Sequence, residues 1–171
     1  MIDYPILSIL IWFPIIVGVA LVAFNNLSKS TSSIIALVTT LLVLIISIQL
    51  LQYYDSDSIN LQFVEKVQWI SGFNIFYYLA VDGISVSLII LTAFIIFLIV
   101  IFTQSEQYDN KSSYLGYFLI LEGLLMGTFS AFDSILFYIF FESLLIPLFL
   151  IIGIWGGPNR KYATLKLFLY T

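Results

Sequence analysis

Runs of apolar residues, each close to the length of a membrane span, dominate this chain. A spanning helix needs roughly twenty apolar residues, because the hydrocarbon core of a bilayer is about 30 Å thick. The predicted spans are approximately 6–24, 31–51, 84–103, 114–132 and 134–155, followed by an incomplete run at 162–171. The sequence therefore predicts an all-α fold: a polytopic transmembrane helix bundle in contact with the lipid bilayer, with residues 1–171 as a single transmembrane domain.

The small number of charged side chains supports this fold class and narrows the chemistry. Charged residues make up 9% of the 171 residues, against about 25% in a soluble domain. The net charge of −4 argues against nucleic acid as a partner, since binding to it needs clustered Lys and Arg. The chain has no cysteine and no histidine, so we expect no metal site and no cofactor site. Any proton chemistry must use carboxylates, Lys, Tyr or water.

Two glutamates, Glu122 and Glu142, lie inside neighbouring apolar runs, on either side of a short turn at Asp133. Each is about ten residues, or roughly 15 Å of helix, from that turn, which places both near the middle of a bilayer. Ionisable groups at that depth are energetically expensive and are functional candidates for that reason. We expect the two carboxylates to handle protons or cations within the membrane.

Glu142 is the stronger candidate because Pro147 follows it within the same run. Proline has no amide hydrogen, so it should leave the Ser143 carbonyl without a helical donor and kink the helix beside the carboxylate. The functional interpretation is a carboxylate that exchanges a proton or cation in a cleft between helices. The alternative is a neutral glutamic acid that hydrogen-bonds to a partner helix.

Glu122 and Lys166 are weaker candidates. Gly123 and Gly127 form a small-residue face that should let another helix approach closely. Glu122 is therefore either a second functional carboxylate or the source of an interhelical hydrogen bond. Lys166 either extends to the water boundary or provides the counter-charge of a carboxylate relay.

The polar segments between the runs predict the topology. The stretch 52–74 has alternating pieces and suggests a short extramembrane hairpin, with Trp69 near the interface. Asp82 and Asp133 stand at helix starts, where capping of free N–H groups accounts for them. One side of the membrane would receive a single cation, Lys66. The other side would receive Lys29, Lys111, Arg160 and Lys161. The positive-inside rule then places the N-terminus outside.

Two segments resemble a known family. They are residues 137–171, FYIFFESLLIPLFLIIGIWGGPNRKYATLKLFLYT, and residues 78–85, YLAVDGIS. Both look like parts of the chain 4 family (bacterial subunit M) of NADH:quinone oxidoreductase, the proton-pumping respiratory complex I. The resemblance covers essentially the whole chain, which would form the N-terminal part of a longer, antiporter-like subunit. Because the sixth run stops about halfway through a span, we expect a fragment, a split gene product or a truncated gene product.

The resemblance implies a subunit without a redox centre, with FMN, iron–sulfur clusters and quinone held by other subunits of the complex. Glu142 stands at the family's fifth-helix glutamate, which pairs with a lysine on a later helix across a proton half-channel. That lysine would lie beyond Thr171. The implied partners are other membrane subunits of complex I and, if the subunit is split, its remainder. The implied location is the bacterial inner membrane, with the mitochondrial inner membrane as the alternative.

We therefore predict a proton-translocating membrane subunit that couples NADH-to-quinone electron transfer to proton pumping. It would belong to an enzyme, an oxidoreductase and translocase, only as part of the complex, and we do not expect the isolated chain to be catalytic. Two alternatives stay open. The first is a subunit of a multi-subunit cation/proton antiporter, and the second is a truncated, non-catalytic scaffold.

Overall fold

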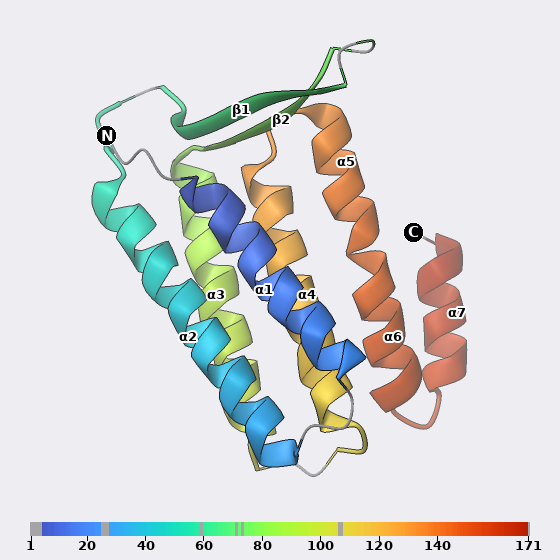
Figure 1. The fold of residues 1–171 in the computed structure, drawn as a ribbon. Helices are drawn as coiled ribbons and strands as arrows, with labels where there is room; N and C mark the ends of the chain where they lie inside the picture. The colour runs from blue at the N-terminus through green and yellow to red at the C-terminus, as the bar shows by residue number, and fades with distance from the viewer. Residues whose placement is uncertain are drawn as a thin grey trace.

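The computed structural model describes residues 5–24, 28–58, 60–70, 72, 74–105 and 108–170. The helices are α1 (Ile6–Ala23), α2 (Lys29–Tyr53), α3 (Gly83–Thr103), α4 (Lys111–Ser130), α5 (Ser134–Ser143), α6 (Leu145–Trp155) and α7 (Arg160–Tyr170). The strands are β1 (Gln62–Ile70) and β2 (Ile75–Val81). The helices form a bundle with the two strands lying across one end (Figure 1). This confirms the predicted fold class. The parts of our predictions that fall on residues 1–4, 25–27, 59, 71, 73, 106–107 and Thr171 lie outside the described residues.

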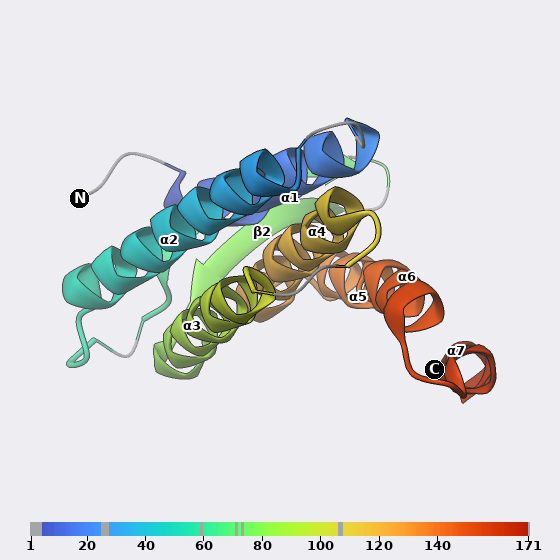
Figure 2. The same ribbon diagram turned by 90° about the horizontal axis from the view of Figure 1, so that it is seen from below.

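Among the described residues, four segments are long and apolar enough to cross a membrane: α1, α2, α3 and the combined stretch of α5 and α6. Helix α4 has 20 residues but is not among the four. It lies inside the bundle, where it contacts α1, α2, α3, α5 and α6 (Figure 2). A helix covered by other helices needs less apolar surface than one that faces lipid. Position in the bundle therefore explains why the fourth predicted run, 114–132, is the most polar of the five complete runs.

Helices α1 and α4 pack with their backbones in contact. A Cβ atom added to Gly18 would lie 2.6 Å from the Gly116 carbonyl oxygen, and one added to Gly123 would overlap the Ile11 carbonyl oxygen. The predicted close approach at Gly123 is therefore confirmed, with α1 as the neighbour. At Gly127 the neighbour is different, because the Phe140 ring of α5 fills the space that a Cβ would occupy. Gly123 and Gly127 of α4 are thus in close contact with two different helices, α1 and α5.

The predicted hairpin is present, but its bounds differ from those expected. Strands β1 and β2 pair antiparallel, with Lys66 opposite Tyr78. The second strand continues to Val81, whereas the sequence suggested that the hairpin ends at residue 74. The extension has a physical reason, since β2 also binds the turn between α4 and α5. The Phe132 N–H donates to the Tyr78 carbonyl at 2.9 Å, and Leu79 forms a bridge with Ala131.

The hairpin also caps the first helix. Pro5, the residue before α1, provides no side-chain cap. Instead, the Glu65 carboxylate of β1 accepts hydrogen bonds from the backbone N–H groups of Leu7, at 2.8 Å, and of Ser8. The Ser8 hydroxyl also bonds to Glu65 and lies 3.0 Å from the Tyr77 hydroxyl. The backbone N–H groups of Leu7 and Ser8, which have no partner within α1, are therefore satisfied by a residue far along the chain.

Two aspartates cap helices as predicted. Asp82 Oδ1 accepts the Ser85 N–H at 2.7 Å, and this bond holds the pKa of the Asp82 carboxyl below its usual value. Asp133 caps α5 by accepting the Leu136 N–H at 3.2 Å, and its second oxygen accepts the Phe76 N–H of β2 at 3.4 Å. These bonds, that from Leu136 foremost, lower the pKa of Asp133. One carboxylate thus joins the hairpin to the helix that carries Glu142.

Candidate functional site

Glu142 lies beside an interruption between two short helices. Helix α5 ends at Ser143 and α6 begins at Leu145, while Leu144 keeps helical dihedral angles of φ −59° and ψ −29°. The direction of the helix therefore continues across the break. Pro147, one turn further on, has no amide to donate to the Ser143 carbonyl. The Ser143 side chain does not fill this gap, because its hydroxyl donates to the Ile139 carbonyl at 2.6 Å. A polar backbone group is thus available beside the carboxylate, near the middle of the combined helix.

The Glu142 side chain is exposed at the edge of the bundle. Positions 138, 142, 146 and 149 share one helical face, and the other three carry the exposed side chains of Tyr138, Ile146 and Phe149. Figure 2 shows α5 and α6 on the outer side of α4. In a bilayer this face would present a carboxylate to lipid unless other protein covered it. The arrangement therefore calls for a covering partner.

Glu122 is in the opposite environment. Its side chain is 0% exposed, and no described residue forms a hydrogen bond with either carboxylate oxygen. On α4 it shares a buried stripe with Leu115, Leu119 and Met126. An enclosed carboxyl group without partners is uncommon in a folded protein and requires an explanation.

The two glutamates do not face each other. The Phe140 ring of α5 contacts Gly127, which marks the side of α4 that faces the Glu142-bearing helix. Glu122 is five positions earlier, so its side chain leaves α4 about 140° away around the helix axis. The structure therefore separates the two carboxylates that the sequence placed at one depth.

Lys166 is exposed on α7. Its ammonium group lies over two rings of its own helix, 5.1 Å from the Tyr162 ring centre and 6.0 Å from that of Tyr170. Helix α7 packs on α6, where the Phe149 and Phe168 rings are 6.0 Å apart. The role of Lys166 as a counter-charge stays a prediction.

Sequence reasoning missed the network of Glu65, Ser8 and Tyr77, because no local pattern links positions so far apart along the chain. It also gave no weight to the buried hydroxyls of α2 and α3, described below. Within the described residues, no group of three or more His, Cys, Asp or Glu side chains could hold a metal ion.

A bundle of membrane-length helices, with one interrupted beside a mid-span carboxylate, defines the class of this protein: an integral membrane protein with several spans. Residues 131–171, which include Glu142, match the family described as the transmembrane region of NADH:quinone oxidoreductase and Mrp antiporter proteins. The chain is 35% identical to NADH-quinone oxidoreductase subunit M of Rickettsia typhi, over 100% of this chain and 36% of that protein. It is also 35% identical to F420H2 dehydrogenase subunit M of Methanosarcina mazei, over 98% of this chain and 33% of that protein.

The fold agrees with these relationships. In respiratory complex I from Thermus thermophilus, one chain superposes with a TM-score of 0.77 and 24% identity, over 92% of this chain and 31% of that one. These comparisons support a complex I membrane subunit of the subunit M type, which in Arabidopsis thaliana is named chain 4. It spans about a third of the length of the curated relatives it matches.

Proposed function

We propose that this chain is part of a proton-translocating subunit of NADH:quinone oxidoreductase, with Glu142 as the residue that exchanges the proton. The position of Glu142 carries the proposal: an exposed mid-span carboxylate beside a helix interruption, within the segment that matches the family. In this proposal FMN, iron–sulfur clusters and quinone are held by other subunits, and this chain contributes no redox chemistry.

The exposed face around Glu142 suggests how translocation is controlled. A carboxylate at mid-membrane depth is stabilised in its ionised form by a nearby cation and in its neutral form by an apolar environment. If the covering partner carries a cation that moves or changes charge, the proton affinity of Glu142 follows that change. We propose that the remainder of the subunit, or a neighbouring membrane subunit of the complex, supplies this cation.

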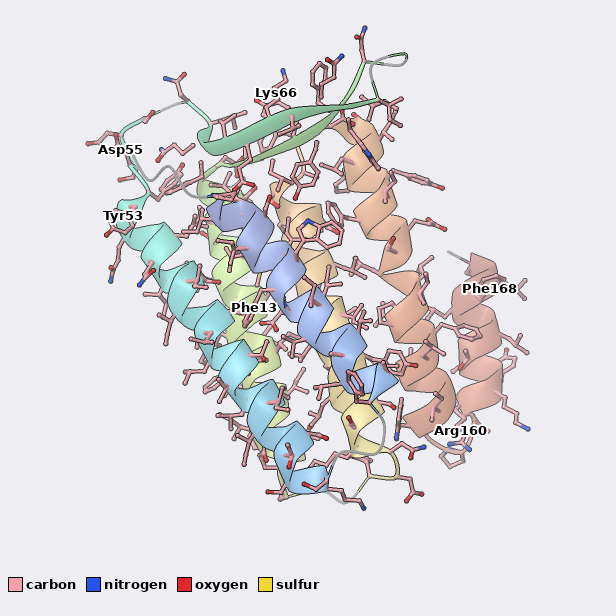
Figure 3. The ribbon with its side chains drawn as sticks, viewed as in Figure 1. Phe13, Tyr53, Asp55, Lys66, Arg160 and Phe168 are labelled. Carbon is pink, nitrogen blue, oxygen red and sulfur yellow. The ribbon has the colours of Figure 1, made fainter. Side chains whose placement is uncertain are left out.

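The proposed orientation follows from the charges at the two ends of the bundle. Asp55 and Lys66 lie at the hairpin end, and Arg160 lies at the opposite end (Figure 3). Helices α2, α4 and α7 all begin at this end, so Lys29, Lys111 and Lys161 in their first turns lie there as well. By the positive-inside rule this end faces the bacterial cytoplasm or the mitochondrial matrix, and the hairpin and N-terminus face outside.

Substitution of Glu142 in the complete complex tests the proposal. Glu142→Gln keeps the size and polarity of the side chain but cannot exchange a proton. We expect NADH-driven proton translocation to fall by at least about tenfold, since positioned acid–base groups typically contribute more than this. Glu142→Asp is the matched control and should retain part of the activity. Translocation by Glu142→Gln at the wild-type ratio of protons to electrons would overturn the proposal.

A second candidate function is that of a subunit in a cation/proton antiporter. The match to a family that includes Mrp antiporter proteins favours it. Copurification distinguishes the two candidates, because flavin and iron–sulfur subunits should accompany a complex I subunit and not an antiporter. A third candidate, a non-catalytic scaffold, predicts that Glu142→Ala leaves translocation by the assembled complex unchanged.

A further inference from the structure

Glu122 is a buried ionisable group that the proposed function leaves unused. Its surroundings can be inferred from the two buried clusters to which its neighbours on α4 belong. Leu119 shares a cluster with Ala36 of α2 and Val100 of α3, and Met126 shares a larger one that includes Val43 of α2 and Ala93 of α3. Glu122 lies between Leu119 and Met126 on the same stripe. Its carboxyl group is therefore directed to the junction of α2, α3 and α4.

Buried threonines lie close to this level on the two facing helices. Thr39 and Thr40 lie between Ala36 and Val43 on α2, and Thr92 is next to Ala93 on α3; all three are buried. Each hydroxyl donates to a carbonyl of its own helix: Thr39 to Ile35 at 2.8 Å, Thr40 to Ala36 at 3.0 Å and Thr92 to Leu88 at 2.8 Å. A hydroxyl that has donated its hydrogen can still accept one. The threonine oxygens near Glu122 can therefore accept a hydrogen bond, whereas their hydroxyl hydrogens are already donated to helix carbonyls.

The facing helices provide no compensating charge. Helices α1 and α3 contain no charged residue, and the only one in α2 is Lys29, at its first position. On α4 itself the other charged residue is Lys111, also at the first position. A buried carboxylate without a cation or hydrogen-bond donors is strongly disfavoured, whereas a neutral carboxylic acid can donate to a threonine oxygen.

From this geometry we propose that Glu122 is a second proton-binding site, separate from Glu142, which holds its proton in the resting protein and exchanges it with water during turnover. The threonines allow both charge states. While Glu122 is neutral, a rotation of its side chain brings the O–H to a threonine oxygen, to which it donates. When the proton passes to water, a threonine hydroxyl rotates away from its own helix carbonyl and donates to the carboxylate. Resting protonation is independent of the proposed function, whereas exchange during turnover depends on it.

Infrared difference spectroscopy of the complete complex tests this site. We expect the wild-type spectrum minus that of Glu122→Gln to show the carbonyl band of a protonated carboxylic acid, which shifts in D2O and changes when NADH starts turnover. Thr40→Val removes an acceptor and should move the band. Thr103→Val, another buried threonine of α3 that donates to its own helix, is the matched control and should not move it. If Glu122→Gln prevents assembly, Glu122→Met, of similar volume, replaces it.

Two results would overturn the inference. One is a resting spectrum in which no carboxylic acid band depends on Glu122, which would mean an ionised side chain. The other is a band that stays unchanged during turnover while Glu142-dependent translocation proceeds, which would mean a structural acid. The test is distinct from that of the proposed function. Wild-type translocation by Glu142→Gln would refute the role of Glu142 while leaving a Glu122 band in the resting protein intact.

Discussion

Glu122 and Glu142 lie at similar depths in adjacent helices, yet their surroundings are opposite. Glu122 is fully buried on α4, with no described hydrogen-bond partner, whereas Glu142 is exposed on the outer face of α5. Depth in a membrane determines what an ionisable group costs. The neighbouring helices determine whether the group can meet a partner. The described part of the chain covers the first carboxyl completely and leaves the second exposed.

The helix packing around the two groups differs in the same way. Beside Glu122, α4 packs on α1 through glycines that bring the two backbones into contact. Beside Glu142, the helix is interrupted at Leu144 and has an exposed face. The surroundings of Glu122 are therefore closely packed, and those of Glu142 are open on one side.

The largest expected difference comes from placing a fixed positive charge at each site. Glu122→Lys should destabilise the bundle by about 3–5 kcal/mol, the typical cost of an uncompensated buried charge. Glu142→Lys should change the stability of this chain by no more than about 0.5 kcal/mol, as usual for an exposed position. Unfolding of both variants in detergent, followed by helical circular dichroism, measures the difference. Equal losses would show that the two environments are alike.

A smaller difference is expected from added methyl groups. Gly123→Ala would push a Cβ into the Ile11 carbonyl oxygen and should cost about 1–3 kcal/mol, as overpacking does. Gly153→Ala on α6 is the matched control, since its Cβ would lie at an ordinary 3.5 Å from the Thr164 side chain. That variant should be neutral or slightly stabilising, because alanine favours helix more than glycine does. The same unfolding assay compares the two, and destabilisation by both would contradict the contrast in packing.

The smallest effect concerns the aspartates that start the two regions. Asp82 starts α3, on the Glu122 side, and Asp133 starts α5, on the Glu142 side; both have pKa values below the usual Asp value of about 3.9. Between the lowered and the usual pKa, the unfolded chain binds more protons, so stability increases with pH. This contribution is complete above the usual pKa and is lost as pH falls through the lowered one. Asp82→Asn and Asp133→Asn should each flatten the acid side of the stability curve, measured by unfolding from pH 5 downward. An unchanged curve would mean that the caps are not linked to stability.

The sequence was sufficient to predict the helices, because a run of about twenty apolar residues rarely forms anything other than a membrane-spanning helix. Observed and predicted helix ends differ by three residues at most, at the start of α4, which begins at Lys111 rather than at residue 114. The second strand was harder to predict. Residues Ile75–Val81 are mostly apolar and lead directly into the cap at Asp82, and only pairing with β1 identifies them as a strand.

The separation of the two glutamates could not be predicted from the sequence. A helix that is apolar on all sides has no periodic signal to show which face is buried. No pattern along the chain therefore indicated which of the two carboxylates is buried. Gly123 and Gly127 did indicate a close neighbour, but the identity of the helix that approaches each one is a property of the tertiary fold.

The bond from Glu65 to the start of α1 also bears on biosynthesis. Leu7 and Ser8 leave the ribosome 58 and 57 positions before Glu65, so the cap of α1 cannot form until the hairpin has been translated. By then α2 must have crossed the membrane and returned the chain to the side on which α1 begins. If either helix inserted in the wrong direction, the bilayer would separate Glu65 from these amides. The hydrogen bonds from Leu7 and Ser8 to Glu65 therefore form only in chains in which α1 and α2 cross the membrane in opposite directions.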